Sequence, residues 1–232
     1  MCKFSDVAAE PTDTAFLERL FTESGDGQGG MFDYWRDNSG GAVSLAGSEV
    51  HGWFDLPLSL ATAQGWTWPG VRTDLMRVCM AAADAEVDFR PFHGIVACIN
   101  AVIDSGSAGR QELPADGASK TFGLVTLDPA AWFPTFAAHE MGHGFGLPHS
   151  FSADPARVEY GDGWDIMSAM TFGGSWPLYS DPVLGISGPN LCAPTGTASA
   201  GSPAARPSTC RRSAAGRRSN SPRWRADRRA PS

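Results

Sequence analysis

The sequence lacks several features that would place it in large protein classes. It has no apolar run of about 18 residues or more, so we expect no membrane-spanning helix. Residues 1–194 hold only nine Lys and Arg against 24 Asp and Glu, and a body this acidic argues against nucleic acid as its partner. The visible N-terminus has no long apolar segment and no small-residue cleavage site, so it carries no recognisable secretory signal. Either the protein stays inside the cell or its true start lies upstream.

The five cysteines form no CxxC pair and no dense framework, which excludes cysteine-based zinc and redox motifs. Two readings of Cys79 and Cys98 stay open. They form a disulfide if the protein is exported, or they are two buried thiols. No EF-hand-like spacing is visible among the acidic residues, so calcium binding is left unknown.

What the chain does have is enough apolar material for a core, since 42% of its 232 residues are hydrophobic. The amino-acid composition changes near residue 190. Residues 195–232 hold nine Arg and a single acidic residue, and Trp224 is their one large apolar residue. We therefore expect a folded domain over residues 1–189 and a disordered basic tail over 190–232. The tail fits an out-of-frame translation best. A flexible linker and a segment that binds acidic partners are the alternatives.

Local patterns predict a mixture of helices and strands in the folded part. The apolar spacing predicts short helices over 15–22 and 32–35, and an Ala- and Met-rich run predicts a longer helix over 75–87. Two strands are expected around a turn at residues 47–48, over 42–45 and 50–54. Two more apolar runs predict buried strands over 94–102 and 122–127.

Residues 139–149 carry the strongest chemical signal, the pattern HExxHxxGxxH. His139 and His143 are four residues apart, so in a helix both imidazoles lie on one face and can reach one metal ion. Glu140 would stand beside the ion as a general base. Gly146 can adopt the left-handed conformation that ends a helix, and the turn would bring His149 round as a third ligand. Three neutral nitrogens leave a position of Zn²⁺ open to water, which is the catalytic arrangement.

The pattern resembles the long signature of the metzincin clan of zinc metallopeptidases, in which a methionine-containing turn follows. Within the clan the chain looks most like the group around gametolysin and immune inhibitor A. The likeness rests on AHEMGHGFGLPHS at 138–150 and YGDGWDIMS at 160–168, and more loosely on FDYWRDNS at 32–39 and VHGWFDL at 50–56. It covers roughly residues 3–190.

This resemblance implies an α+β catalytic domain with a twisted mixed β-sheet, an active-site helix that ends at Gly146, and a smaller C-terminal part. It implies one catalytic Zn²⁺, protein or peptide substrates and an extracellular location. Met167 would be the methionine of the turn, with Met170 a weaker candidate. Some metzincins bind the metal through a tyrosine two residues after that methionine, but this position is Ala169 here. The strand before the helix would bind substrate as an added strand through Leu124, Val125 and Thr126.

Two other functions compete with a zinc-dependent endopeptidase. The chain could be a noncatalytic zinc-binding or protein-binding module, although a purely structural site does not need Glu140. Alternatively, the Arg-rich tail could be the functional element, with the acidic body as its carrier.

Overall fold

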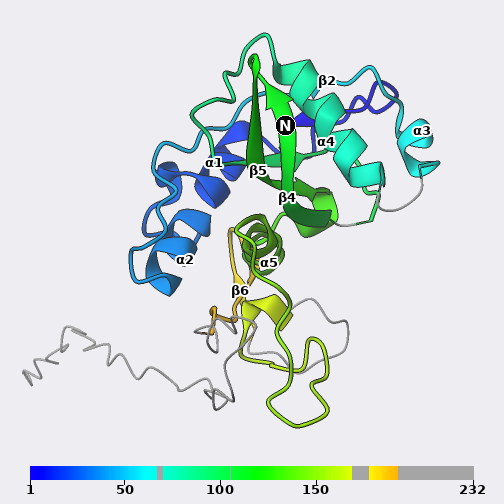
Figure 1. Ribbon diagram of the computed structural model, residues 1–232. Helices are drawn as coiled ribbons and strands as arrows, with labels where there is room; N and C mark the ends of the chain where they lie inside the picture. Colours follow the sequence, from blue (N-terminus) through cyan, green and yellow to red (C-terminus); the bar gives the residue numbers. More distant parts are fainter. Residues whose placement is uncertain (67–69, 105, 169–177, 193–232) are drawn as a thin grey trace, which may run out of the picture.

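The computed structural model describes residues 1–66, 70–104, 106–168 and 178–192 (Figure 1). In these ranges the α-helices are α1 (Thr14–Phe21), α2 (Met31–Asn38), α3 (Leu60–Gln64), α4 (Gly70–Ala83) and α5 (Pro134–Gly144). The strands are β1 (Cys2–Lys3), β2 (Phe54–Asp55), β3 (Gly94–Cys98), β4 (Gly106–Ala115), β5 (Ala118–Leu127), β6 (Tyr179–Asp181) and β7 (Gly185–Ser187). Short 3-10 turns are η1 (Glu23–Gly25), η2 (Pro129–Ala131) and η3 (Ile166–Ser168).

The largest sheet has three strands in the order β3-β5-β4. β5 pairs with β3 in parallel, with Ile95 opposite Leu124, and with β4 antiparallel, with Ala108 opposite Val125. The sheet is therefore mixed, as expected. The strand predicted over 122–127 lies within β5, and only the first part of the strand predicted over 94–102 forms a strand, β3, which ends at Cys98; β4 was not predicted. Its residues include two glycines and a proline, which weaken the alternating pattern that marks a strand.

Apolar side chains on the two faces of the sheet belong to two separate cores. Val125 and Leu127 of β5 pack in the core that includes α1, α2 and α5. Phe122 and Leu124, which alternate with them, pack in the core that includes α4. The period of two along β5 thus places helices on both faces of the sheet, and Figure 1 shows α1 and α2 on the opposite side from α4.

The N-terminal third matches the helix predictions but not the strand predictions. α1 and α2 cover the predicted segments 15–22 and 32–35, and α4 covers most of 75–87. The expected strands over 42–45 and 50–54 are wrong, since only Phe54 and Asp55 form a strand, and it pairs in parallel with β1. Val43, Leu45 and Val50 instead pack as irregular chain against the first core, which explains their apolar character without a hairpin.

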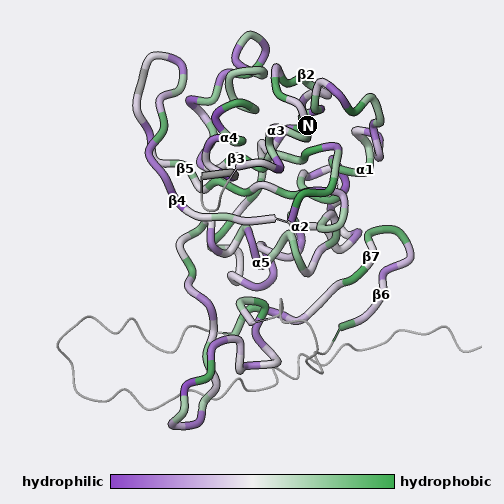
Figure 2. Tube along the Cα trace, turned by 90° about the vertical axis from the view of Figure 1, so that its right-hand side faces the viewer, coloured by the Kyte–Doolittle hydropathy of each residue, from purple (hydrophilic) through white to green (hydrophobic). Residues whose placement is uncertain are grey.

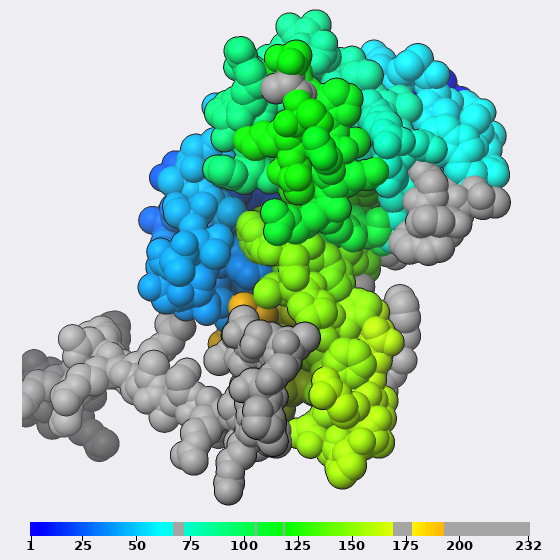
Figure 3. All heavy atoms as spheres, in the orientation of Figure 1, coloured from blue at the N-terminus to red at the C-terminus, as the bar shows by residue number. Residues whose placement is uncertain are grey.

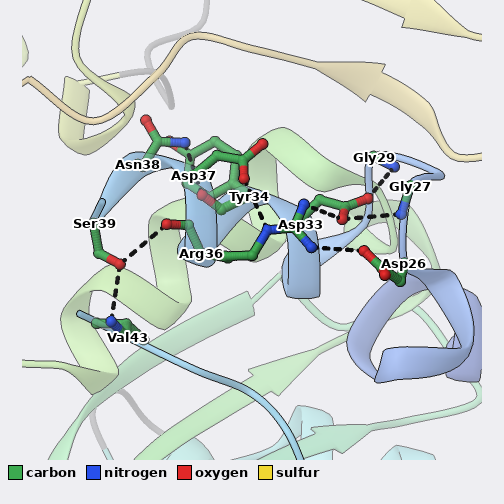
Figure 4. Close-up of polar contacts among 10 residues, drawn as sticks. All are labelled: Asp26, Gly27, Gly29, Asp33, Tyr34, Arg36, Asp37, Asn38, Ser39 and Val43. Carbon is green, nitrogen blue, oxygen red and sulfur yellow. Dashed lines mark hydrogen bonds and ion pairs between the residues drawn. The ribbon is translucent and has the colours of Figure 1, made fainter. Parts of the chain in front are cut away.

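The glycine-rich loop between α1 and α2 is held by Asp33, a buried residue in the first turn of α2 (Figure 4). Its two carboxylate oxygens accept hydrogen bonds from the backbone N–H groups of Gly27, at 3.0 Å, and Gly29, at 2.8 Å. Arg36, one turn later, pairs with Asp33 at 2.8 Å and with Asp26 at 2.6 Å. These bonds fix the loop on the N-terminal end of α2, where a negative charge is favoured.

The chain after α5 lies on the far side of that helix from the sheet. Figure 3 shows residues around 150–165, in yellow-green, at the lower end of the molecule, and Figure 2 shows the hairpin of β6 and β7 to the right of α5. The last described residues return to α2, where the Tyr34 hydroxyl donates to the carbonyl of Pro189 at 3.1 Å. The smaller C-terminal part is therefore attached to both α5 and α2.

Three remaining expectations have simple outcomes. Cys79 and Cys98 are free and buried, so the reading as two buried thiols holds. In the part of the chain that the structure describes, no helix is long and apolar enough to span a membrane. Residues 193–232, which make up nearly all of the predicted basic tail, lie outside the described residues.

Candidate metal centre

α5 supplies the first two histidines from a position between the sheet and the C-terminal part. Pro134 is the first residue of the helix, where its missing N–H costs nothing. Nearly every residue of α5 is buried, on both faces. His139 and His143 lie one turn apart, and their Nε2 atoms are 3.1 Å apart. Two ligands of one tetrahedral Zn²⁺ are separated by about 3.3 Å, so this spacing suits a shared ion.

The turn after α5 explains how the third histidine returns to the first two. The helix ends at Gly144, two residues before the predicted end at Gly146. The N–H of Gly146 bonds to the carbonyl of His143, and the N–H of Leu147 bonds to that of Gly142, both at 2.9 Å. Gly146 has φ +91°, the left-handed conformation of a Schellman turn. Gly146 therefore has the predicted role of reversing the chain.

The reversal brings all three predicted ligands together. The imidazole of His149 lies with its centroid 4.7 Å from that of His143 and 5.5 Å from that of His139. One ring nitrogen from each histidine lies within 4.8 Å of the others. The full HExxHxxGxxH pattern thus places three imidazoles around one point.

Hydrogen bonds at the outer nitrogens orient all three rings. The Nδ1 of His139 lies 2.9 Å from the carbonyl of Ile166, and the Nδ1 of His143 lies 2.8 Å from that of Leu147. The Nδ1 of His149 lies 2.6 Å from a carboxylate oxygen of Glu159. Carbonyl and carboxylate oxygens accept, so each Nδ1 carries the proton and each Nε2 keeps its lone pair. This is how metal-binding histidines are held in proteins.

The protonation state of the cluster also suits a cation. Burial lowers the pKa of His139 to about 4, because the Ile166 carbonyl only partly offsets the loss of water. Burial lowers the pKa of His143 as well. Both imidazoles are therefore neutral at pH 7. Imidazole nitrogens held in fixed tautomers fit Zn²⁺, for which histidine is a common ligand.

Glu140 follows His139 in α5 and is buried, and its charge acts on Tyr160, which contacts His149. Burial raises the pKa of the Glu140 carboxyl to about 7; nearby Arg72 opposes this rise, and Asp104 adds to it. Arg72 and Asp104 form an ion pair of 2.9 Å. A carboxyl group with a pKa near neutrality can both take and give a proton, as a general acid–base residue must.

Met167, the methionine expected from the resemblance, lies against α5. It sits in η3, is buried, and its side chain contacts Gly142, in the middle of the α5 turn that separates the two helical histidines. A Cβ on Gly142 would overlap the Met167 Sδ, so any larger residue there requires the Met167 side chain to move. Asp165 fixes the turn by accepting the Met167 N–H at 2.9 Å. Met170 and Ala169 lie outside the described residues.

The predicted substrate strand is wrong. Leu124, Val125 and Thr126 belong to β5, which has β3 on one side and β4 on the other. Its backbone groups are therefore used by its neighbours, and an added strand has no place there. Within the described residues β4, at the edge of the sheet, has a strand on only one side.

Glu159 and Tyr160 reach the cluster without having been predicted. The Tyr160 hydroxyl lies 2.8 Å from the Nε2 of His149, and its ring lies 4.2 Å from that imidazole between centroids. Both residues follow the motif by ten residues or more, and no spacing rule connects them to it. The YGD sequence at 160–162 was visible only as part of the resemblance.

Comparisons with family models, with curated proteins and with solved structures found no match. The interpretation of this site therefore depends on its own residues.

Proposed function

We propose that this chain is a zinc-dependent metalloendopeptidase that hydrolyses peptide bonds in protein or peptide substrates. The observation that supports it best is the arrangement and hydrogen bonding of the three imidazoles. Each Nδ1 is bonded to an acceptor, which leaves the three Nε2 atoms to converge on one point, with buried Glu140 beside them. A purely structural zinc site does not need a carboxyl base.

In this proposal the residues of the site have separate roles. His139, His143 and His149 would hold the ion through their Nε2 atoms, and the acceptors at Nδ1 keep the rings in place. When bound, Zn²⁺ supplies Lewis-acid polarisation of the substrate carbonyl and lowers the pKa of water. Glu140 would take the proton of the attacking water at its carboxylate and pass it to the leaving amine. Met167 would support the helix from below.

The likeness to metzincins adds to this proposal. Two observations support it: the positive φ of Gly146 in the turn after α5, and the contact of the Met167 side chain with Gly142. The same likeness extends the proposal to an extracellular location.

The test is hydrolysis of casein, an unstructured protein, by the purified chain with and without a zinc chelator. We expect one zinc per chain and cleavage that the chelator abolishes. Glu140→Gln should lower kcat by about 10²–10⁴-fold while zinc content stays the same, because Gln cannot take a proton. Glu86→Gln, on the segment after α4, is the matched control and should leave kcat unchanged.

Two results would contradict the proposal. Zinc retained at one per chain without any cleavage would favour the noncatalytic zinc-binding module. Cleavage that survives both the chelator and Glu140→Gln would show that another site, or a contaminant, hydrolyses the casein.

A further inference from the structure

Tyr160 reaches the one nitrogen of His149 that the proposed function assigns to the metal. Its hydroxyl lies 2.8 Å from Nε2, while the Nδ1 of the same ring is held by Glu159. Nε2 has a single lone pair. Tyr160 can keep its hydrogen bond to Nε2, or Nε2 can bind an ion, but not both. The phenol therefore needs another partner once the ion is present.

The phenol oxygen lies close enough to His149 to reach an ion bound there. Two ligands, each about 2.0–2.1 Å from a tetrahedral Zn²⁺, lie about 3.3 Å apart. The Nε2 atoms of His139 and His143, 3.1 Å apart, are near this separation, and the Tyr160 oxygen, 2.8 Å from the His149 Nε2, is within about 0.5 Å of it. The Tyr160 ring also stacks on that of His139, with 28° between the ring planes and centroids 6.3 Å apart.

The backbone around Tyr160 is built to hold this side chain in place. Phe151 and Glu159 pair as an antiparallel bridge, and the N–H of Tyr160 bonds to the carbonyl of Ser150 at 2.8 Å. Tyr160 has φ +59°, an uncommon conformation for a residue other than glycine. In an extended strand two consecutive side chains point to opposite faces. Here the left-handed residue lets Glu159 and Tyr160 contact the two nitrogens of one imidazole.

We propose that Tyr160 is a fourth protein ligand of the ion, bound through its phenol oxygen with its proton released to solvent. This inference rests on the proposed function, because it assumes that His139, His143 and His149 bind a metal. It adds a residue outside the HExxHxxGxxH pattern, seven residues before Met167. A substrate carbonyl would then have to compete with Tyr160 for a position on the ion.

The test is titration of Cu²⁺ into the metal-free full-length chain, followed by visible absorption. A phenolate bound to Cu²⁺ gives a charge-transfer band that histidine ligands alone do not give. The chain has only three tyrosines, and Tyr34 donates to the Pro189 carbonyl. We expect the band in the unmodified protein, its loss in Tyr160→Phe, and its persistence in Tyr179→Phe, a change at an exposed residue of β6.

Zinc affinity gives a second measurement that does not depend on copper. Competition with a chromogenic chelator should show that Tyr160→Phe weakens Zn²⁺ binding by about tenfold or more, whereas Tyr179→Phe leaves it unchanged. Phe keeps the ring that contacts His149 and loses only the hydroxyl's hydrogen bond, so the thermal midpoint of the metal-free variant should fall by no more than a few degrees.

The possible failures are distinguishable. One Cu²⁺ bound without the band, or a band that persists in Tyr160→Phe, would overturn the assignment of Tyr160 while leaving the three-histidine site intact. Failure of the unmodified chain to bind either Cu²⁺ or Zn²⁺ at one per chain would overturn both this inference and the proposed function.

Discussion

The Nδ1 atom of His149 lies 2.6 Å from a carboxylate oxygen of Glu159, a residue that the HExxHxxGxxH pattern does not contain. A carboxylate at this position fixes the imidazole tautomer and makes its other nitrogen a better ligand. Glu159→Gln should therefore weaken Zn²⁺ binding by about 10–100-fold, measured by competition with a chromogenic chelator.

The sequence offers a matched control for this prediction. Glu49 contacts His51 at 2.9 Å, also through an exposed carboxylate and an imidazole, but away from the cluster. Glu49→Gln should leave Zn²⁺ affinity unchanged. If both variants weakened binding equally, the effect would be one of overall charge, and the role assigned to Glu159 would be wrong.

Gly146 should be sensitive to substitution because of its backbone conformation alone. Its φ is +91°, and a side chain there costs about 1–2 kcal/mol. Gly146→Ala should lower the free energy of unfolding by that amount in urea titration. It should also weaken Zn²⁺ binding, since the turn delivers His149. Gly144→Ala is the control, because a Cβ there meets ordinary contacts at 3.6 Å. That variant should be neutral or up to about 1 kcal/mol more stable, and an equal loss in both would contradict the argument.

Met167 and Gly142 should be energetically coupled. A Cβ on Gly142 would overlap the buried Met167 side chain, so Gly142→Ala should destabilise the chain by about 1–3 kcal/mol. Met167→Ala should cost about 2–5 kcal/mol through the cavity it leaves. The double variant should cost clearly less than the sum of the two, because the added methyl then fills part of that cavity. Strict additivity in urea titration would show that the two side chains do not meet.

The contribution of Asp33 to the free energy of unfolding should depend on pH. Burial acts to raise its pKa, but the N–H groups of Gly27 and Gly29 and its other partners outweigh this and lower it below the usual value. The contribution of Asp33 is thus complete above its unfolded-state pKa near 3.8 and is lost as the pH falls through the lower folded-state value.

Asp33→Asn should lower the free energy of unfolding by about 1–3 kcal/mol at pH 7. The difference from the unmodified chain should shrink in urea titrations between pH 4 and pH 2. Asp37→Asn, at an exposed neighbouring residue, is the control and should have little effect at either pH. If the difference in free energy of unfolding between Asp33→Asn and the unmodified chain stayed constant with pH, the ionised carboxylate of Asp33 would not be the source of the stabilisation.

The sequence predicted the parts of the site that local spacing determines. His139 and His143 share a helix face because of the helical period, and Gly146 reverses the chain because glycine tolerates a positive φ. The partners of these residues come from elsewhere. The Ile166 carbonyl that orients His139 is 27 residues away, and a backbone oxygen has no sequence signature.

The errors have equally specific causes. Phe122–Leu127 reads as an apolar strand whether it lies at the centre or the edge of a sheet, and β4, which pairs with it, contains residues unfavourable to strands. The order of strands depends on contacts that composition does not encode. Glu159 and Tyr160 were missed because their left-handed turn contains no glycine at residue 160 to mark it.

The short hairpin over residues 150–160 has a consequence for how the site assembles. His149 obtains both of its partners from residues only ten and eleven positions further along the chain. Closing so small a loop costs little entropy, so this hairpin can form before the strands of the sheet pair with one another. Conversely, a single proteolytic cut between Asp154 and Arg157 would separate His149 from both partners while leaving the helix with its two histidines. Protection of this loop from proteases should therefore rise when zinc is added.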